Sequence, residues 1–351
     1  MKMDSKANRC RNFISQSPCP KYLTTLGLRK NLNRFHMSYI LTWLKSLIAA
    51  VMLMVVVGGA TRLTHSGLSM AQWKPLHVLP PITQQAWDDE FGLYQQTPEY
   101  KHVNKGMSLS EFKCIYWWEY GHRLLGRIVG ILVLLPLFFL FKDIPNWLRG
   151  RIAIVFSLGG AQGVIGWWMV KSGLKIDPTV SHIRLCVHLV MAFIILSVLA
   201  RALWKFEGKL FKKICLRDAT LLVIIGLTII YGAYVAGLKA GFIYNTFPLM
   251  EGQWLPNEWN FYQPIWKNFI NNPATVQWLH RLLALITVTY STILWIKHGS
   301  TYRLITIKII AQVALGISTL LLQVPLAVAL LHQAWAMVVW MIALKTVWVK
   351  K

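Results

Sequence analysis

The chain has 351 residues, of which 55% are hydrophobic and only 14% are charged, and its mean hydropathy is +0.46. A soluble domain carries about 25% charged residues, so a soluble globular protein, a disordered chain and a collagen-like chain are excluded and an integral membrane protein remains. The five cysteines are odd in number and show no C-x-x-C spacing, which argues against a disulfide framework and against a zinc site.

The apolar runs of the chain are long enough to cross a bilayer as helices, which takes about 20 residues each. They are continuous and lack the alternation of a membrane β-barrel. We therefore predict an all-α integral membrane protein with eight transmembrane helices. They cover 44–62, 119–141, 152–170, 183–203, 219–238, 274–296, 304–323 and 327–345.

Basic residues predict how these spans are oriented. Most of the 37 Lys and Arg residues lie in the N-terminal tail, in the connections 142–151, 201–218 and 297–308, and at the C-terminus. Cytoplasmic loops are enriched in Lys and Arg, so both termini are predicted to be cytoplasmic. The net charge of +24 is then a topology signal, and no nucleic-acid partner is expected.

The basic N-terminal segment leaves two cellular locations open. We interpret residues 1–43 as a basic cytoplasmic tail on a multi-pass protein of the bacterial inner (cytoplasmic) membrane. A mitochondrial transit peptide, and with it the mitochondrial inner membrane, is the alternative, because this segment is rich in basic residues and almost free of acids.

Sequence motifs recur between the two halves of the chain. The second span contains His122-Arg123-Leu124-Leu125 and the sixth contains His280-Arg281-Leu282-Leu283. The third span contains Ala161-Gln162-x-x-x-Gly166 and the seventh contains Ala311-Gln312-x-x-x-Gly316. The matched order predicts two four-helix repeats related by a pseudo-two-fold axis along the membrane normal. Their predicted bounds are 44–203 and 219–345, with a basic inside linker at 204–218 and a basic tail at 346–351.

One histidine lies near the outer end of each even-numbered span. These residues are His122, His188, His280 and His332. Ionisable side chains inside a bilayer are costly and usually functional, and neutral imidazole is a good ligand for iron. Because helix bundles hold cofactors between facing helices, we predict one bis-histidine haem site per repeat, His122 with His188 and His280 with His332. A histidine hydrogen-bonded to a nearby carbonyl is the alternative for each.

The residues beside the predicted ligands suggest further contacts with a haem. Gly126 and Gly130 share the helix face of His122 and would admit a flat ring, although ordinary G-x-x-x-G helix packing explains them equally well. Arg123 and Arg281 are predicted to bind haem propionates, because a buried arginine needs an anionic partner. Snorkelling of these arginines to the lipid headgroups is the alternative.

A carboxylate distinguishes the two repeats. Glu119 precedes His122 by three residues, so both project from one helix face, and the equivalent position in the second repeat is Gln277. A group that exchanges protons suits chemistry, whereas an amide suits passive electron transfer, so Glu119 is predicted to be a catalytic acid–base. The alternative is an acid favoured by the dipole at a helix N-terminus.

The first connection carries the most specific sequence signal. The stretch Gly58-Gly59-Ala60-Thr61-Arg62-Leu63-Thr64-His65-Ser66-Gly67-Leu68-Ser69, followed by Trp73-Lys74-Pro75, closely resembles the haem A synthase family, as does Glu119-Tyr120-Gly121-His122-Arg123. The resemblance runs from about residue 44 to 345 and includes all four histidines, whereas residues 82–113 carry no recognisable signal.

The resemblance implies a membrane oxidoreductase that acts on a methyl group. It would convert haem O to haem A for cytochrome oxidase by successive water-derived hydroxylations that turn the C8 methyl into a formyl group. By resemblance, His280 and His332 would hold haem b, and His122 and His188 would hold the substrate haem O. Glu119 would be the essential acid.

The resemblance also implies partners and one departure from the family. Haem O synthase and an electron donor are expected, besides membrane lipid, and a homo-oligomer stays open. Some family members have a cysteine pair in the first outer loop, but this chain has only Cys114 in its outer loops, like the branch shared by alphaproteobacteria and mitochondria. Two other functions remain as alternatives, a di-haem electron-transfer cytochrome and a haem transporter or chaperone.

Overall fold

A computed structural model describes residues 20–73, 79–174 and 178–350 of the chain, with side chains from Met37 onwards. Over these residues the fold is all-helical, with two isolated β-bridges and no named strand. Eight of the described helices are long and apolar enough to cross a membrane, so the chain is a multi-pass membrane protein. Residues 1–19 of the predicted basic tail lie outside the described residues.

Each of the eight predicted spans is a helix in the structure. The helices are α1 Pro20–Leu63, α4 Leu109–Phe139, α5 Asn146–Gly173, α6 His182–Phe206, α7 Leu216–Gly237, α9 Pro273–His298, α10 Ser300–Leu321 and α11 Leu326–Trp348. Two of them begin well before the predicted spans, because an apolar run marks the bilayer crossing and not the helix end. The start of α4 is fixed by a capping box between Ser108 and Glu111.

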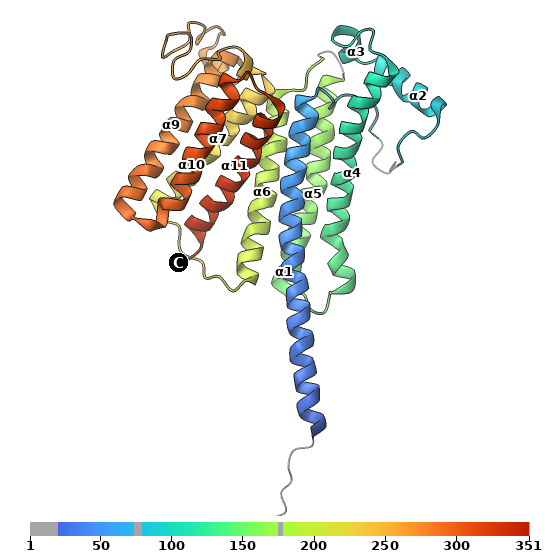
Figure 1. Ribbon diagram of the computed structural model, residues 1–351, viewed down its shortest axis with the longest axis vertical. Coiled ribbons are helices and arrows are strands. Elements are labelled where there is room, and N and C mark those ends of the chain that lie inside the picture. The colour runs from blue at the N-terminus through green and yellow to red at the C-terminus, as the bar shows by residue number, and fades with distance from the viewer. Residues whose placement is uncertain (1–19, 74–78, 175–177, 351) are drawn as a thin grey trace, which may run out of the picture.

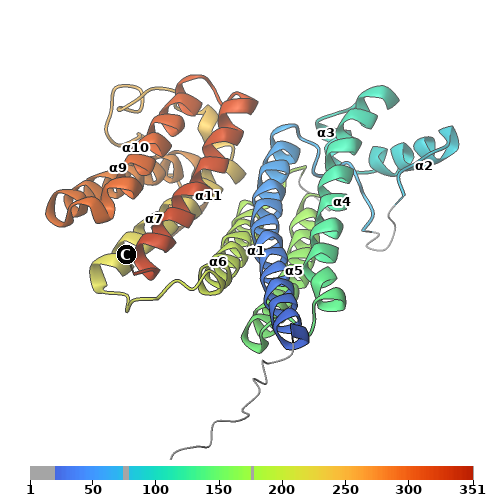
Figure 2. The ribbon, with the colours of Figure 1, turned by 60° about the horizontal axis from the view of Figure 1, so that its bottom comes forward.

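The spanning helices form two groups of four (Figures 1 and 2). In the first group α1 packs on α4 and α6, and α5 packs on the same two helices. In the second group α7 packs on α9 and α11, and α10 packs on those two. Between the groups α6 contacts α7 and α1 contacts α11. A two-fold relation would require these matched contacts, which therefore support the predicted repeats.

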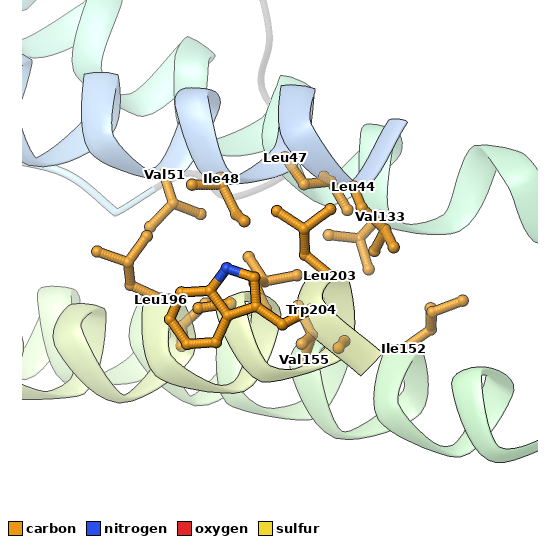
Figure 3. Packing of buried hydrophobic residues seen from close by; sticks show 14 of the residues in the cluster. Leu44, Leu47, Ile48, Val51, Val133, Ile152, Val155, Leu196, Leu203 and Trp204 are labelled. Atoms are coloured by element: carbon orange, nitrogen blue, oxygen red, sulfur yellow. The ribbon is translucent and has the colours of Figure 1, made fainter. Parts of the chain in front are cut away.

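A buried apolar cluster joins the helices of the first group (Figure 3). Leu44 and Leu47 of α1 face Leu196 and Trp204 of α6, and the cluster extends to Met337 of α11. Lipid tails are as apolar as these side chains, so close packing, and not the hydrophobic effect, holds such helices together. The shared cluster thus fixes α11 of the second group against the first.

The connection between α1 and α4 folds into a small helical cap. It contains α2 Gln84–Gln95 and α3 Pro98–His102, at the same end of the molecule as the connection between α7 and α9 (Figure 1). The latter contains η1 Ala240–Phe242, η2 Ile265–Lys267 and α8 Asn268–Asn271. The C-terminal end of α11 and the linker between α6 and α7 lie at the opposite end. The region 82–113, which carried no sequence signal, is therefore an ordered part of the fold.

A buried carboxyl group lies inside this cap. Glu99 is 6% exposed, and the Tyr94 hydroxyl donates a hydrogen bond of 3.2 Å to its Oε2. Asn104 Nδ2 in turn donates to the Tyr94 hydroxyl over 2.8 Å. Burial raises the pKa of Glu99 from its ordinary value of 4.5 to about 7. The carboxyl group is therefore the titratable element of the cap near neutral pH.

The raised pKa predicts a cap that loosens as the pH rises. Between pH 4.5 and about 7 the folded cap binds a proton that the unfolded cap lacks. Its stabilisation is therefore complete below pH 4.5 and is lost as the pH rises through the folded pKa. The protection factors of the amides in residues 83–107, from which the intrinsic rise of hydrogen exchange with pH is divided out, should fall over this pH range, and Glu99→Gln should flatten that fall. An identical pH dependence in Glu99→Gln would show that another group is responsible.

Candidate functional site

Each of the four predicted ligand histidines lies against a glycine of a neighbouring helix. A methyl group added at Gly58 of α1 would lie 3.1 Å from Nε2 of His122 on α4. One added at Gly232 of α7 would lie 3.1 Å from Cε1 of His280 on α9. These distances are tighter than nearly all real Cβ contacts. Each imidazole therefore occupies the space that a side chain would take on the facing helix.

The other two histidines use the A-Q-x-x-x-G motifs found in the sequence. Gly166 of α5 lies against His188 of α6, where an added methyl group would be 3.1 Å from Cε1. The same distance from Gly316 of α10 to His332 of α11 is 2.9 Å. The glutamine of each motif contacts the backbone of the same histidine. Gln162 Nε2 donates to the His188 carbonyl over 2.9 Å, and Gln312 Nε2 donates to the His332 carbonyl over 3.0 Å.

The two histidines of each predicted pair are electrostatic neighbours in the structure, and their binding of a haem stays a prediction. His188 is an electrostatic neighbour of His122, and His280 is an electrostatic neighbour of His332. We call His122 and His188 the N-terminal pair, and His280 and His332 the C-terminal pair. Within the described residues no group of three or more His, Cys, Asp or Glu side chains gathers around a common point.

The ring nitrogens are arranged in a way that fits a haem. Nδ1 of His280 lies 3.1 Å from the Thr228 carbonyl, and donation of its N–H there leaves Nε2 free for iron. In the described part of the chain the buried Nδ1 of His188 has no hydrogen-bond partner. An unpaired polar atom at this depth is costly, and coordination or hydrogen bonding at a bound haem would remove the cost.

Glu119 lies one helical turn above the N-terminal pair and anchors the first connection. It is 3% exposed, and its Oε2 accepts hydrogen bonds from Ser69 Oγ at 2.8 Å and from the Met70 backbone N–H at 2.7 Å. Its Oε1 forms an ion pair with Arg123. The carboxyl group is thus buried and bound to the stretch that carried the most specific sequence signal.

Gln277 makes the corresponding contacts in the second half. It is 2% exposed, and its Nε2 donates to the Ala240 carbonyl at 2.9 Å and to the Tyr244 carbonyl at 3.2 Å. Its Oε1 accepts a hydrogen bond of 3.2 Å from Arg281. Glu119 and Gln277 therefore both connect a spanning helix to the outer connection of its half. They differ because a carboxyl group can exchange a proton and an amide cannot.

The two arginines predicted to bind propionates lie at the outer connections. Arg123 donates to the carbonyls of Met70 and Gln72, each over 3.0 Å. Arg281 donates to the carbonyls of Thr246 and Tyr244, over 2.7 and 2.8 Å. Their terminal nitrogens therefore hold the connections in place. Among the described residues, the buried Nε of Arg281 has no hydrogen-bond partner and remains available to an anion.

Sequence reasoning missed half of the glycine contacts. Gly166 and Gly316 belong to a repeated motif, but Gly58 and Gly232 lie in stretches with no common pattern around them. Gly126, which shares the helix face of His122, has only the end of the Met54 side chain near its Cβ position. A glycine that lies five residues before the C-terminal end of the first helix of each half, Gly58 in α1 and Gly232 in α7, is the spacing that could have been noticed.

Comparisons with known proteins show the family of the chain. Residues 41–344 match the COX15-CtaA family, described as cytochrome oxidase assembly protein. The chain is 42% identical to a protein of Sinorhizobium medicae, over 89% of both chains, and 42% identical to one of Chelativorans, over 93% of both. A protein of Parvibaculum lavamentivorans is 44% identical over 86% of this chain and 91% of its own. All three relatives are named heme A synthase. The chain thus belongs to the COX15-CtaA family of cytochrome oxidase assembly proteins.

Proposed function

We propose that this protein converts haem O to haem A by oxidising the C8 methyl group of the porphyrin to a formyl group. In net terms the methyl group and one water molecule give the formyl group, four protons and four electrons, so the reaction also requires an electron acceptor. Family membership and the names of the relatives support the reaction. The observation that supports the reaction most directly is a difference between the two halves. Both halves have a histidine pair packed against glycines, but only the N-terminal pair has a buried carboxyl group, Glu119, beside it.

The two pairs are assigned different occupants. His122 and His188 would bind the substrate haem O beside Glu119, and His280 and His332 would hold haem b. A haem iron with two histidine ligands supplies reversible electron transfer. The hydrogen bond of His280 to the Thr228 carbonyl and the close fit of each ring against a glycine favour this assignment. Arg281, whose Nε is unpaired, is proposed as a haem-binding residue, with Arg123 in the corresponding position.

Glu119 is proposed to accept and release protons during the oxidation. It is paired with Arg123 and accepts hydrogen bonds from Ser69 and Met70, so its position relative to the N-terminal pair is fixed. Preorganisation of this kind is what an acid–base group needs. The same contacts tie the first connection to α4, so the carboxylate also links the outer cap to the site.

The fold also favours a membrane orientation. The helical cap and the connection between α7 and α9 lie at one end of the molecule, whereas the linker between α6 and α7 and the C-terminal end of α11 lie at the other (Figure 1). We propose that the second end is cytoplasmic, because basic residues gather there, and that the bacterial inner membrane holds the protein. Haem O synthase, an electron donor and lipid are the proposed partners.

The reaction itself is tested by expression. The chain, produced together with a haem O synthase in a host that lacks haem A, should yield haem A when the haems are extracted and separated by chromatography. A haem-loaded protein that yields none would refute the proposal and leave a di-haem cytochrome or a haem carrier.

Replacement of Glu119 by Gln should separate its two roles. The amide oxygen can still accept the hydrogen bonds from Ser69 and Met70, but general acid–base catalysis would be lost, and this contributes ~10²–10⁴-fold to rates. Haem A yield should fall by about that factor with haem content unchanged. An active Glu119→Gln variant would remove the carboxylate from the chemistry.

The C-terminal pair is tested through the glycine that backs it. Gly232→Ala should displace the His280 ring and lower the haem b retained on purification, measured by the visible spectrum and the haem-to-protein ratio. Gly226→Ala, on the same helix, has nothing within 4 Å of its added methyl group and should retain haem b. His280→Ala and His332→Ala should each lose it. Full retention in both histidine variants would refute the ligand assignment.

A further inference from the structure

One side chain crosses directly from the C-terminal pair to the other half of the protein. Gln333 follows His332 on α11, and its Nε2 donates a hydrogen bond of 2.7 Å to the Val55 carbonyl of α1. An amide at this depth is costly unless it is paired, and a hydrogen bond is directional where an apolar contact is not. The contact therefore fixes the register of α11 on α1.

Gly59 of α1 makes room for this amide. A methyl group added there would lie 2.8 Å from Cδ and 2.9 Å from Nε2 of Gln333, distances that real Cβ atoms essentially never show. The next residue along α1 in the direction of the N-terminus is Gly58, which receives the ring of His122. His332 and His122 are thus joined through one amide side chain and two adjacent glycines.

The matching interface between the halves has no such amide. The predicted repeat pairs Gln333 with Leu189, which follows His188 on α6, and pairs Gly59 with Ala233, which follows Gly232 on α7. Ala233 is buried, and Leu189 packs against the apolar cluster. The two helix contacts that the predicted repeat matches therefore differ, because α1 and α11 hold a glycine and an amide where α7 and α6 hold an alanine and a leucine.

We propose that Gln333 is a positioning residue that sets the distance between the N-terminal and the C-terminal pair. The proposal rests on the proposed function, in which one pair holds the substrate and the other a resident haem. The hydrogen bond to Val55 stops α11 from sliding on α1, and the contact with Gly59 sets how closely the helices approach. A misplacement of about 1 Å at a reactive site can cost ~10²-fold in rate.

Two variants and a matched control test the proposal in the full chain. Gln333→Leu removes the hydrogen bond, and Gly59→Ala with Gln333→Leu copies the residue pair of the other interface. Leu189→Ala disturbs that other interface instead. Haem content, thermal stability and haem A yield are measured for each. In addition, pulsed EPR measures the distance between spin labels on Cys114 and on Leu321→Cys in the haem-free chain, with the other exposed cysteines replaced by serine.

We expect Gln333→Leu to keep its haem content but to shift or broaden the label distance, and to lower haem A yield by about tenfold or more. The double variant should regain thermal stability without regaining yield, whereas Leu189→Ala should leave the distance unchanged. An unchanged distance or yield in Gln333→Leu, full recovery of yield in the double variant, or an equal distance change in Leu189→Ala would each overturn the proposal. Absence of haem A from the parent chain would instead refute the proposed function, and the label distances would still test the role of Gln333.

Discussion

The contact of an imidazole with a glycine on the facing helix is the constraint on which the site depends. Inside a bilayer no water orients a histidine, so packing and a single hydrogen bond must do so. At Gly58, Gly166, Gly232 and Gly316 any larger residue would push the ring away. Glycine within a helix lowers its stability relative to alanine. At these four positions it leaves room for an imidazole ring on the facing helix. Two helices of each half therefore carry the proposed ligands, and the other two carry the glycines that face them.

The two halves have nearly the same scaffold and differ in what it carries. Glu119 and Gln277 are both buried, and both contact the arginine one turn below and the connection above. The exchange of carboxylate for amide thus changes charge and proton capacity while the architecture is kept. Under the proposed function, one half would carry out the oxidation and the other half electron transfer. The packing around each histidine pair would be the same in both.

The interface between the halves also departs from symmetry at one point. α1 on α11 and α6 on α7 are matching crossings, yet Gln333 and Gly59 occupy one of them. Buried polar groups are retained where they specify a single arrangement, as an asparagine does in a coiled coil. The apolar cluster that includes Met337 packs the halves together. The hydrogen bond of Gln333 to Val55 sets the register of α11 along α1.

The sequence by itself determined the eight spans, the four histidines and the contrast of Glu119 with Gln277, because run length and helical spacing are local properties of the chain. Its apolar runs could not show that α4 begins at Leu109 or that 82–113 forms a cap, since these segments are stabilised by capping and aromatic packing. Only the tertiary structure revealed that Arg123 holds the first connection, that Gly58 backs His122, and that Gln333 reaches α1. Those contacts depend on how distant helices are rotated and placed against one another, and no local pattern encodes that rotation.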